Sequence, residues 1–194
     1  MSNTKFLSAI FAVFTLFMTP ITEAHPLFNE QTSWLAGFIH PLLGIDHVLA
    51  LLAVGLWAVQ QGESRLWQLP IVFLTVMVFG AYLGFHGFVL PMAETGVISS
   101  LLLLGVMLVW AVQFSWPSSF LVISFFALFH GYDHSMSIAV GTSFIDYASG
   151  FLTTTSALLG IGTALGLWAR VMHFDNLVRA CGLVIGMTGG WLCI

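Results

Sequence analysis

Long apolar runs alternate with short polar segments along the chain. A helix needs about 20 consecutive apolar residues to cross a bilayer, and runs of this length predict transmembrane helices. The short segments between them carry turn-forming or charged residues, as in "QQGESR" and "SWPSS". The runs lack the period-two alternation of barrel strands, so we predict helices. The six predicted spans are residues 34–59, 67–90, 97–115, 119–140, 148–169 and 177–193.

The beginning of the chain has the pattern of a signal peptide. A single lysine precedes an apolar stretch, residues 6–18, that is short for a spanning helix. Thr22 and Ala24 then place small residues at the −3 and −1 positions of a cleavage site. We therefore expect residues 1–24 to be a cleavable signal peptide. Residues 25–194 are expected to form one domain of an all-α membrane protein, a bundle of six transmembrane helices.

The composition supports a membrane location. Hydrophobic residues make up 59% of the chain and charged residues 6%, with a mean hydropathy of +1.01. A soluble domain carries about 25% charged residues, so this chain lacks the polar side chains to cover a water-facing surface. No basic run indicates nucleic acid as a partner. The expected surroundings are a lipid bilayer, and the sequence leaves open whether the protein is a homo-oligomer.

The arginines predict the orientation of the spans. Arg65 lies between the first and second spans, and Arg170 and Arg179 lie between the fifth and sixth. In a six-span chain both segments fall on one side, which the positive-inside rule makes cytoplasmic. The mature N-terminus is then periplasmic, where a signal peptide would deliver it. We expect a multi-pass protein of the bacterial inner membrane.

Two further residue types bear on packing and depth. All seven tryptophans fall near predicted span ends, where their amphipathic rings favour the membrane interface. Glycines recur at four-residue spacing in the last two spans, as Gly162 with Gly166 and Gly182 with Gly186. Such spacing favours close helix packing.

Ionisable residues gather in the outer half of three predicted spans. The polar side chains lie in the stretches "FIHPLLGIDH", "LGFHG" and "LFHGYDHS". Ionisable groups within a membrane are costly and by default indicate function. The candidate metal ligands are His40, Asp46, His47, His86, His130, Asp133 and His134. His25 is an additional candidate, because cleavage after residue 24 would place its imidazole beside a free amine.

The spacing of these residues favours a shared site. His40 and His47 are about two helical turns apart, and His130 and His134 about one turn, so each pair shares a helix face. Neutral imidazole is a frequent ligand for transition metals, and a carboxylate such as Asp46 binds the ion or orients a ring. A lone membrane histidine more often packs through a hydrogen bond than binds a metal ion. For His86 these two interpretations are equally open. The group as a whole favours a metal or proton pathway.

Two neighbouring features fit such a site. Gly44 and Gly131 allow close approach of backbones beside the polar residues. Pro41 is expected to loosen the first span where a ligand enters, as discontinuous helices do in transporters.

The first of these stretches resembles the HupE/UreJ family, membrane proteins linked to nickel or cobalt uptake for hydrogenase and urease. The family signature HPxxGxDH is matched by His40, Pro41, Gly44, Asp46 and His47. The signal-like start, the "LFHG" of the fourth span and the six-span length also fit. The resemblance covers essentially the whole chain. It implies a hydrogenase or urease accessory protein that transports a metal ion.

The chain departs from the family pattern after "FHG". Family members commonly carry a further histidine and a glutamate in this stretch, where this chain has Tyr132 and Ser137. His130 and His134 are kept, and Asp133 is gained. The departure bears on which metal is bound and how tightly.

The leading interpretation is a secondary permease for a divalent transition metal ion. The resemblance favours nickel or cobalt, with zinc and copper as alternatives. The ion would enter from the periplasmic side and be held by the histidine and aspartate cluster. The protein would then be a transporter and not an enzyme, with no permanently bound cofactor. No Walker A motif for ATP hydrolysis is present.

Two other functions stay open at this point. An intramembrane zinc hydrolase would use the cluster to activate water, although the chain has no HExxH or GxSxG motif. Haem binding by paired histidines is less favoured, because acidic residues accompany each pair.

Overall fold

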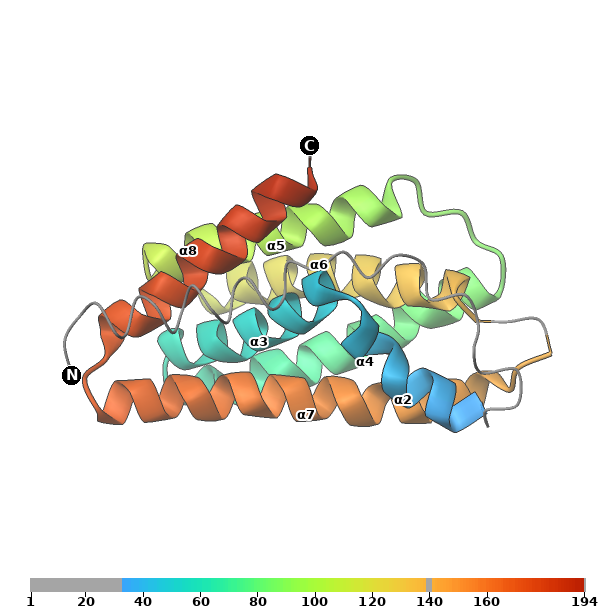
Figure 1. Ribbon diagram of the computed structural model, residues 1–194, viewed down its shortest axis with the longest axis horizontal. Helices are drawn as coiled ribbons and strands as arrows, with labels where there is room; N and C mark the ends of the chain where they lie inside the picture. The colour runs from blue at the N-terminus through green and yellow to red at the C-terminus, as the bar shows by residue number, and fades with distance from the viewer. Residues whose placement is uncertain (1–32, 139–140, 194) are drawn as a thin grey trace. The chain divides into compact units, whose positions relative to one another are not determined.

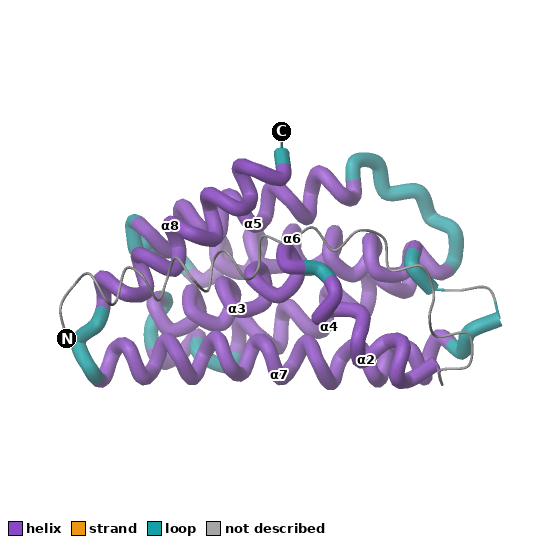
Figure 2. The backbone as a smooth tube through the Cα atoms, in the orientation of Figure 1, coloured by secondary structure: helices purple, strands orange, loops and turns teal. Residues whose placement is uncertain are grey.

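A computed structural model describes residues 33–138 and 141–193 of the chain. The predicted signal peptide and His25 lie outside the described residues. The described elements are all helices, with no strand among them (Figures 1 and 2). They are α2 (Ser33–Leu43), α3 (Ile45–Gln60), the short 3-10 helix η1 (Glu63–Arg65), α4 (Gln68–Phe85), α5 (Ala93–Val109), α6 (Trp116–Met136), α7 (Phe144–Val171) and α8 (Asp175–Leu192).

The first predicted span is two helices and not one. α2 and α3 meet at Gly44 with a bend of 81°, and Figure 2 shows the break as a short loop between them. Pro41 lies inside α2 and has no N–H to donate, while Gly44 adopts an extended conformation (φ −103°, ψ 117°) that ends the helical geometry. The span is broken close to Pro41, but the break lies at Gly44 and Pro41 itself stays within α2. The single helix predicted over 34–59 is wrong.

The other predicted spans each coincide with one helix, with shifted ends. The second span was predicted to continue to residue 90, but α4 ends at Phe85. His86 is therefore the residue that caps α4 and does not lie within the helix. The third helix begins four residues earlier than predicted and ends at Val109, because Trp110 and the residues after it form the turn to α6.

Membrane-spanning helices are present in the described part of the chain. By length and composition, the segments Glu63–Phe85 and Phe144–Val171 are long and apolar enough to cross a bilayer. The bent pair Ser33–Leu43 and Ile45–Gln60 adds a third span if it is counted as one. Ala93–Val109 is apolar but shorter. All six predicted spans thus have helical counterparts, while the number of crossings stays a prediction.

Close glycine contacts join the helices into three groups. A Cβ on any of these glycines would overlap or crowd the backbone of the neighbouring helix, so glycine permits the approach. The contacts define an α2–α3–α7 unit, an α4–α6 pair and an α5–α8 pair, and these groups pack less closely on one another. The glycines are Gly37, Gly55, Gly150 and Gly162 in the first group, Gly80 and Gly131 in the second, and Gly105, Gly182 and Gly189 in the third.

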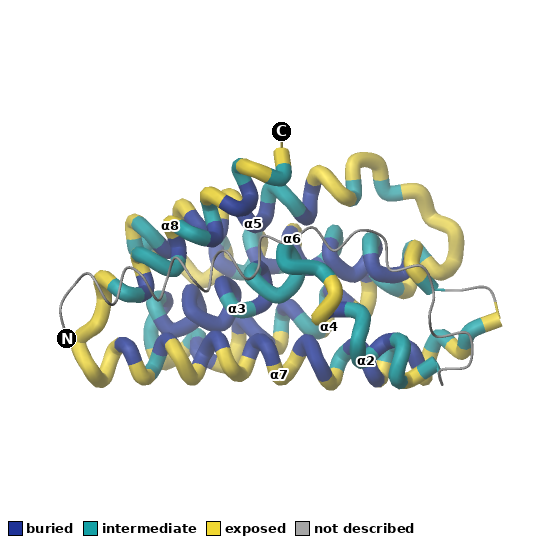
Figure 3. Tube along the Cα trace, in the orientation of Figure 1, coloured by how far each residue is buried: buried dark blue, intermediate teal, exposed yellow. Residues whose placement is uncertain are grey.

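The interior of the helix bundle is apolar and centres on α3. Figure 3 shows α3 as the most continuously buried helix, and Val54, Trp57 and Leu104 have no exposed surface. Trp57 was predicted at the membrane interface, and this is wrong. Its ring is fully buried, and its Nε1–H donates to the carbonyl oxygen of Val112 at 3.1 Å. The other six tryptophans are exposed, as expected for interfacial rings.

The arginine-bearing end of the bundle is held by polar contacts. Arg65 donates to Gln61 Oε1 at 2.9 Å and to Ser119 Oγ at 3.2 Å, which ties the α3–α4 connection to α6. Arg170 at the end of α7 pairs with Glu63 at 3.2 Å. In Figure 1 the helices α3, α5 and α7 end on this side and α4, α6 and α8 begin there.

Candidate metal-binding site

Three histidines from three helices converge at the α2–α3 break. Ligand nitrogens of His40, His47 and His134 all lie within 4.8 Å of one another. The ring centroids are 4.3 Å apart for His47 and His134, 4.9 Å for His40 and His134, and 6.3 Å for His40 and His47. Donor atoms around a tetrahedral ion with bonds of about 2.0–2.1 Å lie roughly 3.3 Å apart. Small side-chain rotations would therefore let all three imidazoles reach one ion.

The break in the first span creates this convergence. On a straight helix, His40 and His47 would be separated by about 10 Å along the axis. The 81° bend at Gly44 folds the end of α2 over the start of α3 and brings the two rings together. A Cβ at Gly44 would lie 2.6 Å from Asp46 Oδ1 and 2.9 Å from His47 Nδ1. Any larger residue at position 44 would therefore displace the side chains of Asp46 and His47 from these positions.

Two carboxylates flank His47. Asp46 Oδ1 lies 2.7 Å from Nδ1, and Asp133 Oδ2 lies 3.7 Å from Nε2. The Nδ1–H direction does not point at Asp46 Oδ1, so the contact between Asp46 and His47 is electrostatic and not an aligned hydrogen bond. Asp46 also lies in the first turn of α3, where the helix dipole stabilises a negative charge. The distance from Asp133 to Nε2 suits two ligands of one ion.

The wall of the site includes α7, which the sequence pattern did not indicate. The His40 ring lies 6.0 Å from the Tyr147 ring and 6.3 Å from the Phe151 ring, and Phe151 lies 4.3 Å from His134. Tyr147 falls in the polar segment "GTSFIDYASG" that was assigned to a loop, so no signal marked it. Thr154 Oγ1 donates to the Phe38 carbonyl oxygen at 2.5 Å and fixes α2 against α7.

His130 lies one turn before His134 on α6 and is 1% exposed. Its ring centroid is 5.7 Å from that of His47 and 6.4 Å from that of His134. His130 therefore adjoins the three converging histidines without belonging to them. Its Nε2 lies 2.9 Å from the hydroxyl of Ser100 on α5, a residue that the sequence analysis did not single out.

The remaining candidates differ in placement. His86 is exposed, and its ring contacts Tyr82 and Phe85 of its own helix, so the structure does not bring it into the histidine group. His25 lies outside the described residues. Tyr132, which departs from the family pattern, is buried beside Gly84 of α4, and Ser137 is the exposed residue that ends α6.

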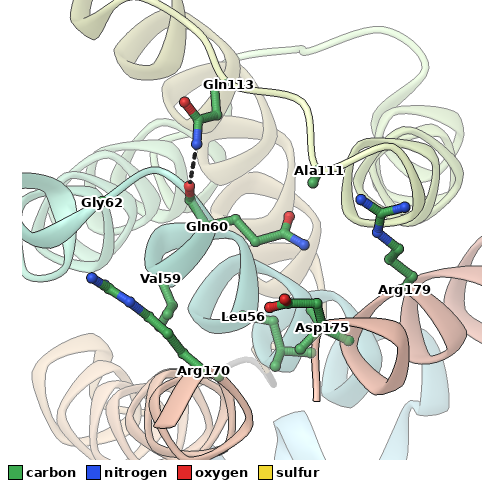
Figure 4. Close-up of a pocket in the computed structure, with 11 residues that line it drawn as sticks. Leu56, Val59, Gln60, Gly62, Ala111, Gln113, Arg170, Asp175 and Arg179 are labelled. Carbon is green, nitrogen blue, oxygen red and sulfur yellow. Dashed lines mark hydrogen bonds between the residues drawn. The ribbon is translucent and has the colours of Figure 1, made fainter. Parts of the chain in front are cut away.

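A cavity lies at the end of the helices opposite to the histidine group. It has a volume of about 410 Å³ and is lined by the ends of α3 and α7, the start of α8 and the α5–α6 connection. Figure 4 shows its polar residues Gln60, Gln113, Arg170, Asp175 and Arg179 around the opening. No histidine lines it. The two features are therefore separate, and the apolar part of α3 lies between them.

These observations define a helical protein with helices long and apolar enough to span a membrane, and with a partly buried cluster of histidines and aspartates. Residues 12–192 match the family model described as HupE / UreJ protein. Protein HupE of Rhizobium leguminosarum bv. viciae is 39% identical over 181 residues, which cover 92% of this chain and 93% of the relative. The chain belongs to the HupE/UreJ family, and the resemblance noted in its sequence is confirmed. No solved structure matches the chain.

Proposed function

We propose that this protein is a secondary permease for a divalent transition metal ion, with nickel or cobalt as the favoured substrates. The observation that carries the proposal is the convergence of His40, His47 and His134 in a partly buried site at a broken helix. Imidazole is a preferred ligand for nickel, cobalt, copper and zinc, and Asp46 and Asp133 supply negative charge. Membership of the HupE/UreJ family, whose members the sequence resemblance links to nickel or cobalt uptake, supports a metal-linked accessory role.

The proposed topology has six crossings in the bacterial inner membrane, with the mature N-terminus in the periplasm. Arg65, Arg170 and Arg179 then lie on the cytoplasmic side, and the histidine cluster lies in the periplasmic half. Reporter domains fused after Gln61 and after His173 should both behave as cytoplasmic. A periplasmic signal from either fusion contradicts this topology.

Release of the ion inward requires movement of the helices. Between His47 and Gln60, α3 presents a buried apolar stretch that includes Leu51 and Val54 and separates the cluster from the far cavity. The cluster lies where the α2–α3–α7 unit meets the α4–α6 pair, and these groups pack less closely on each other than within themselves. We propose that the α4–α6 pair shifts against the α2–α3–α7 unit during transport.

Transport is tested with purified protein in sealed vesicles. We expect uptake of Ni²⁺ or Co²⁺ that saturates, and no uptake of Mg²⁺, which favours oxygen ligands. The double variant His47→Ala, His130→Ala should be inactive, while His86→Ala serves as the matched control. Tight zinc with hydrolytic turnover would instead indicate a hydrolase, and a Soret band would indicate haem. Reversible binding without uptake would contradict the permease assignment.

A further inference from the structure

Ser100 on α5 contacts the metal-binding region through a single histidine. Its side chain has no exposed surface, and its Oγ lies 2.9 Å from His130 Nε2. The same Oγ donates a hydrogen bond to the carbonyl oxygen of Val97, one turn earlier on α5, at 2.6 Å. Ser100 is therefore placed between its own backbone and a buried imidazole.

The proton of this hydroxyl determines which nitrogen of His130 carries hydrogen. A serine hydroxyl has one proton, and here it is directed at Val97. Towards His130 the oxygen can only accept, so Nε2 must be the protonated nitrogen. In a neutral imidazole the other nitrogen, Nδ1, then carries a lone pair.

That lone pair has no partner within the described protein. His130 is 1% exposed, and its Nδ1 is buried without a hydrogen bond. A buried acceptor without a partner is unfavourable, because it has lost its hydrogen bonds to water. The adjacent His47 ring, 5.7 Å away, belongs to the converging histidines. A cation moving through this region would find an available nitrogen at His130.

We propose that Ser100 is a positioning residue that holds His130 in the tautomer with a free Nδ1, so that this nitrogen binds the transported metal ion. The inference rests on the proposed function and adds to it a residue from α5. Metal-bound histidines usually donate their second ring N–H to an acceptor that fixes the tautomer and the ring orientation. In this protein the acceptor is a hydroxyl whose own proton is committed elsewhere.

A double-mutant cycle tests the proposal, with Co²⁺ affinity measured on purified wild-type protein, Ser100→Ala, His130→Ala and the double variant. Loss of a residue that hydrogen-bonds to a metal ligand typically weakens metal affinity by about 10–100-fold. We expect Ser100→Ala to weaken Co²⁺ affinity by an amount in this range. In the His130→Ala background the same change should alter affinity less than about twofold. Thr163→Val removes another buried hydroxyl that bonds only to its own helix, and it should leave affinity unchanged.

Two further measurements separate positioning from a structural effect. X-ray absorption of bound Co²⁺ should lose one nitrogen ligand in both Ser100→Ala and His130→Ala. Ser100→Thr keeps the hydroxyl and should retain most of the affinity. Unchanged affinity in Ser100→Ala, or an equal loss with and without His130, overturns the role of Ser100 and leaves the permease proposal standing. Wild-type protein that binds no Co²⁺ or Ni²⁺ overturns both.

Discussion

The His47 ring on α3 and the His134 ring on α6 lie with their centroids 4.3 Å apart, the shortest separation among the histidines of the site. The two residues belong to helices that pack mainly on other partners, α3 on α7 and α6 on α4. Binding of one ion by both rings would therefore link the α2–α3–α7 unit to the α4–α6 pair. Occupancy of the proposed site and the arrangement of the bundle would then be coupled through this contact.

Removal of His47 should abolish metal binding. We expect His47→Ala to weaken Ni²⁺ affinity by more than about 100-fold, which exceeds the typical loss when a residue that only orients a metal ligand is removed. The variant should insert normally, because alanine is a good helix former and removing a polar group from lipid is favourable. Binding is measured by calorimetry on purified protein. His86→Ala, which changes an exposed histidine outside the group, should bind like wild type, and an equal loss there contradicts the assigned site.

The two carboxylates beside His47 should differ in effect. Asp46 contacts Nδ1 at 2.7 Å, so Asp46→Asn removes charge that orients the ring and should weaken binding by about 10–100-fold. Asp133 Oδ2 lies 3.7 Å from Nε2, a separation that two ligands of one ion can have, so we expect Asp133→Asn to cause the larger loss. Asp175→Asn, at the opposite end of the bundle, is the control. A larger loss of affinity in Asp46→Asn than in Asp133→Asn would show that Asp46 is the carboxylate that binds the ion.

A methyl group at Gly44 should disturb the site without preventing folding. The added Cβ would lie 2.6 Å from Asp46 Oδ1 and 2.9 Å from His47 Nδ1, so both side chains must move. We expect Gly44→Ala to reduce metal affinity by at least about tenfold, similar to the loss when a residue that orients a metal ligand is removed. Gly160→Ala is the matched control, since a Cβ at Gly160 meets no atom within 4 Å. Wild-type affinity in Gly44→Ala would mean that the tight turn is not needed for binding.

A cross-link between the two helix groups should stop transport. Phe85 on α4 and Phe144 on α7 have ring centroids 4.7 Å apart. In a background with Cys181→Ser and Cys193→Ser, a short bismaleimide joining Phe85→Cys to Phe144→Cys should block uptake and leave binding intact. The control pair Leu102→Cys and Gly190→Cys lies within the α5–α8 pair, where a Gly190 Cβ is 4.0 Å from Leu102. Continued uptake by the first cross-linked protein contradicts the proposed movement.

Acid should weaken metal binding. Imidazole titrates near pH 6.5 in water, and a protonated ring has no lone pair for a metal. Protons and the metal ion therefore compete for the histidines, and affinity should fall as the pH decreases and recover when it rises. Calorimetry on purified protein at several pH values measures this directly, without the influence of a pH gradient on transport. An affinity independent of pH between 5 and 8 would argue against imidazole ligands.

The helices and the gathering of polar residues towards one end of them could be predicted from the sequence alone. The apolar runs are helical, with the first one broken at Gly44. Because successive helices alternate in direction, the positions of His40, His47, His130 and His134 along the sequence predicted that they lie towards the same end of the bundle. The family signature also identified the α2–α3 stretch. The close packing predicted from Gly162 and Gly182 is present in the α3–α7 and α5–α8 contacts.

Which helix faces meet depends on tertiary packing that the sequence pattern does not record. Lipid chains are as apolar as the side chains inside a helix bundle, so hydropathy does not distinguish the lipid-facing side of a helix from its buried side. Packing therefore placed Trp57 in the core, brought Ser100 and Tyr147 to the histidines, and left His86 exposed. Pro41 indicated that the first span is irregular, but the 81° angle between α2 and α3 follows no pattern in the sequence, and in the structure α2 packs closely on α7 through Gly37 and Gly150.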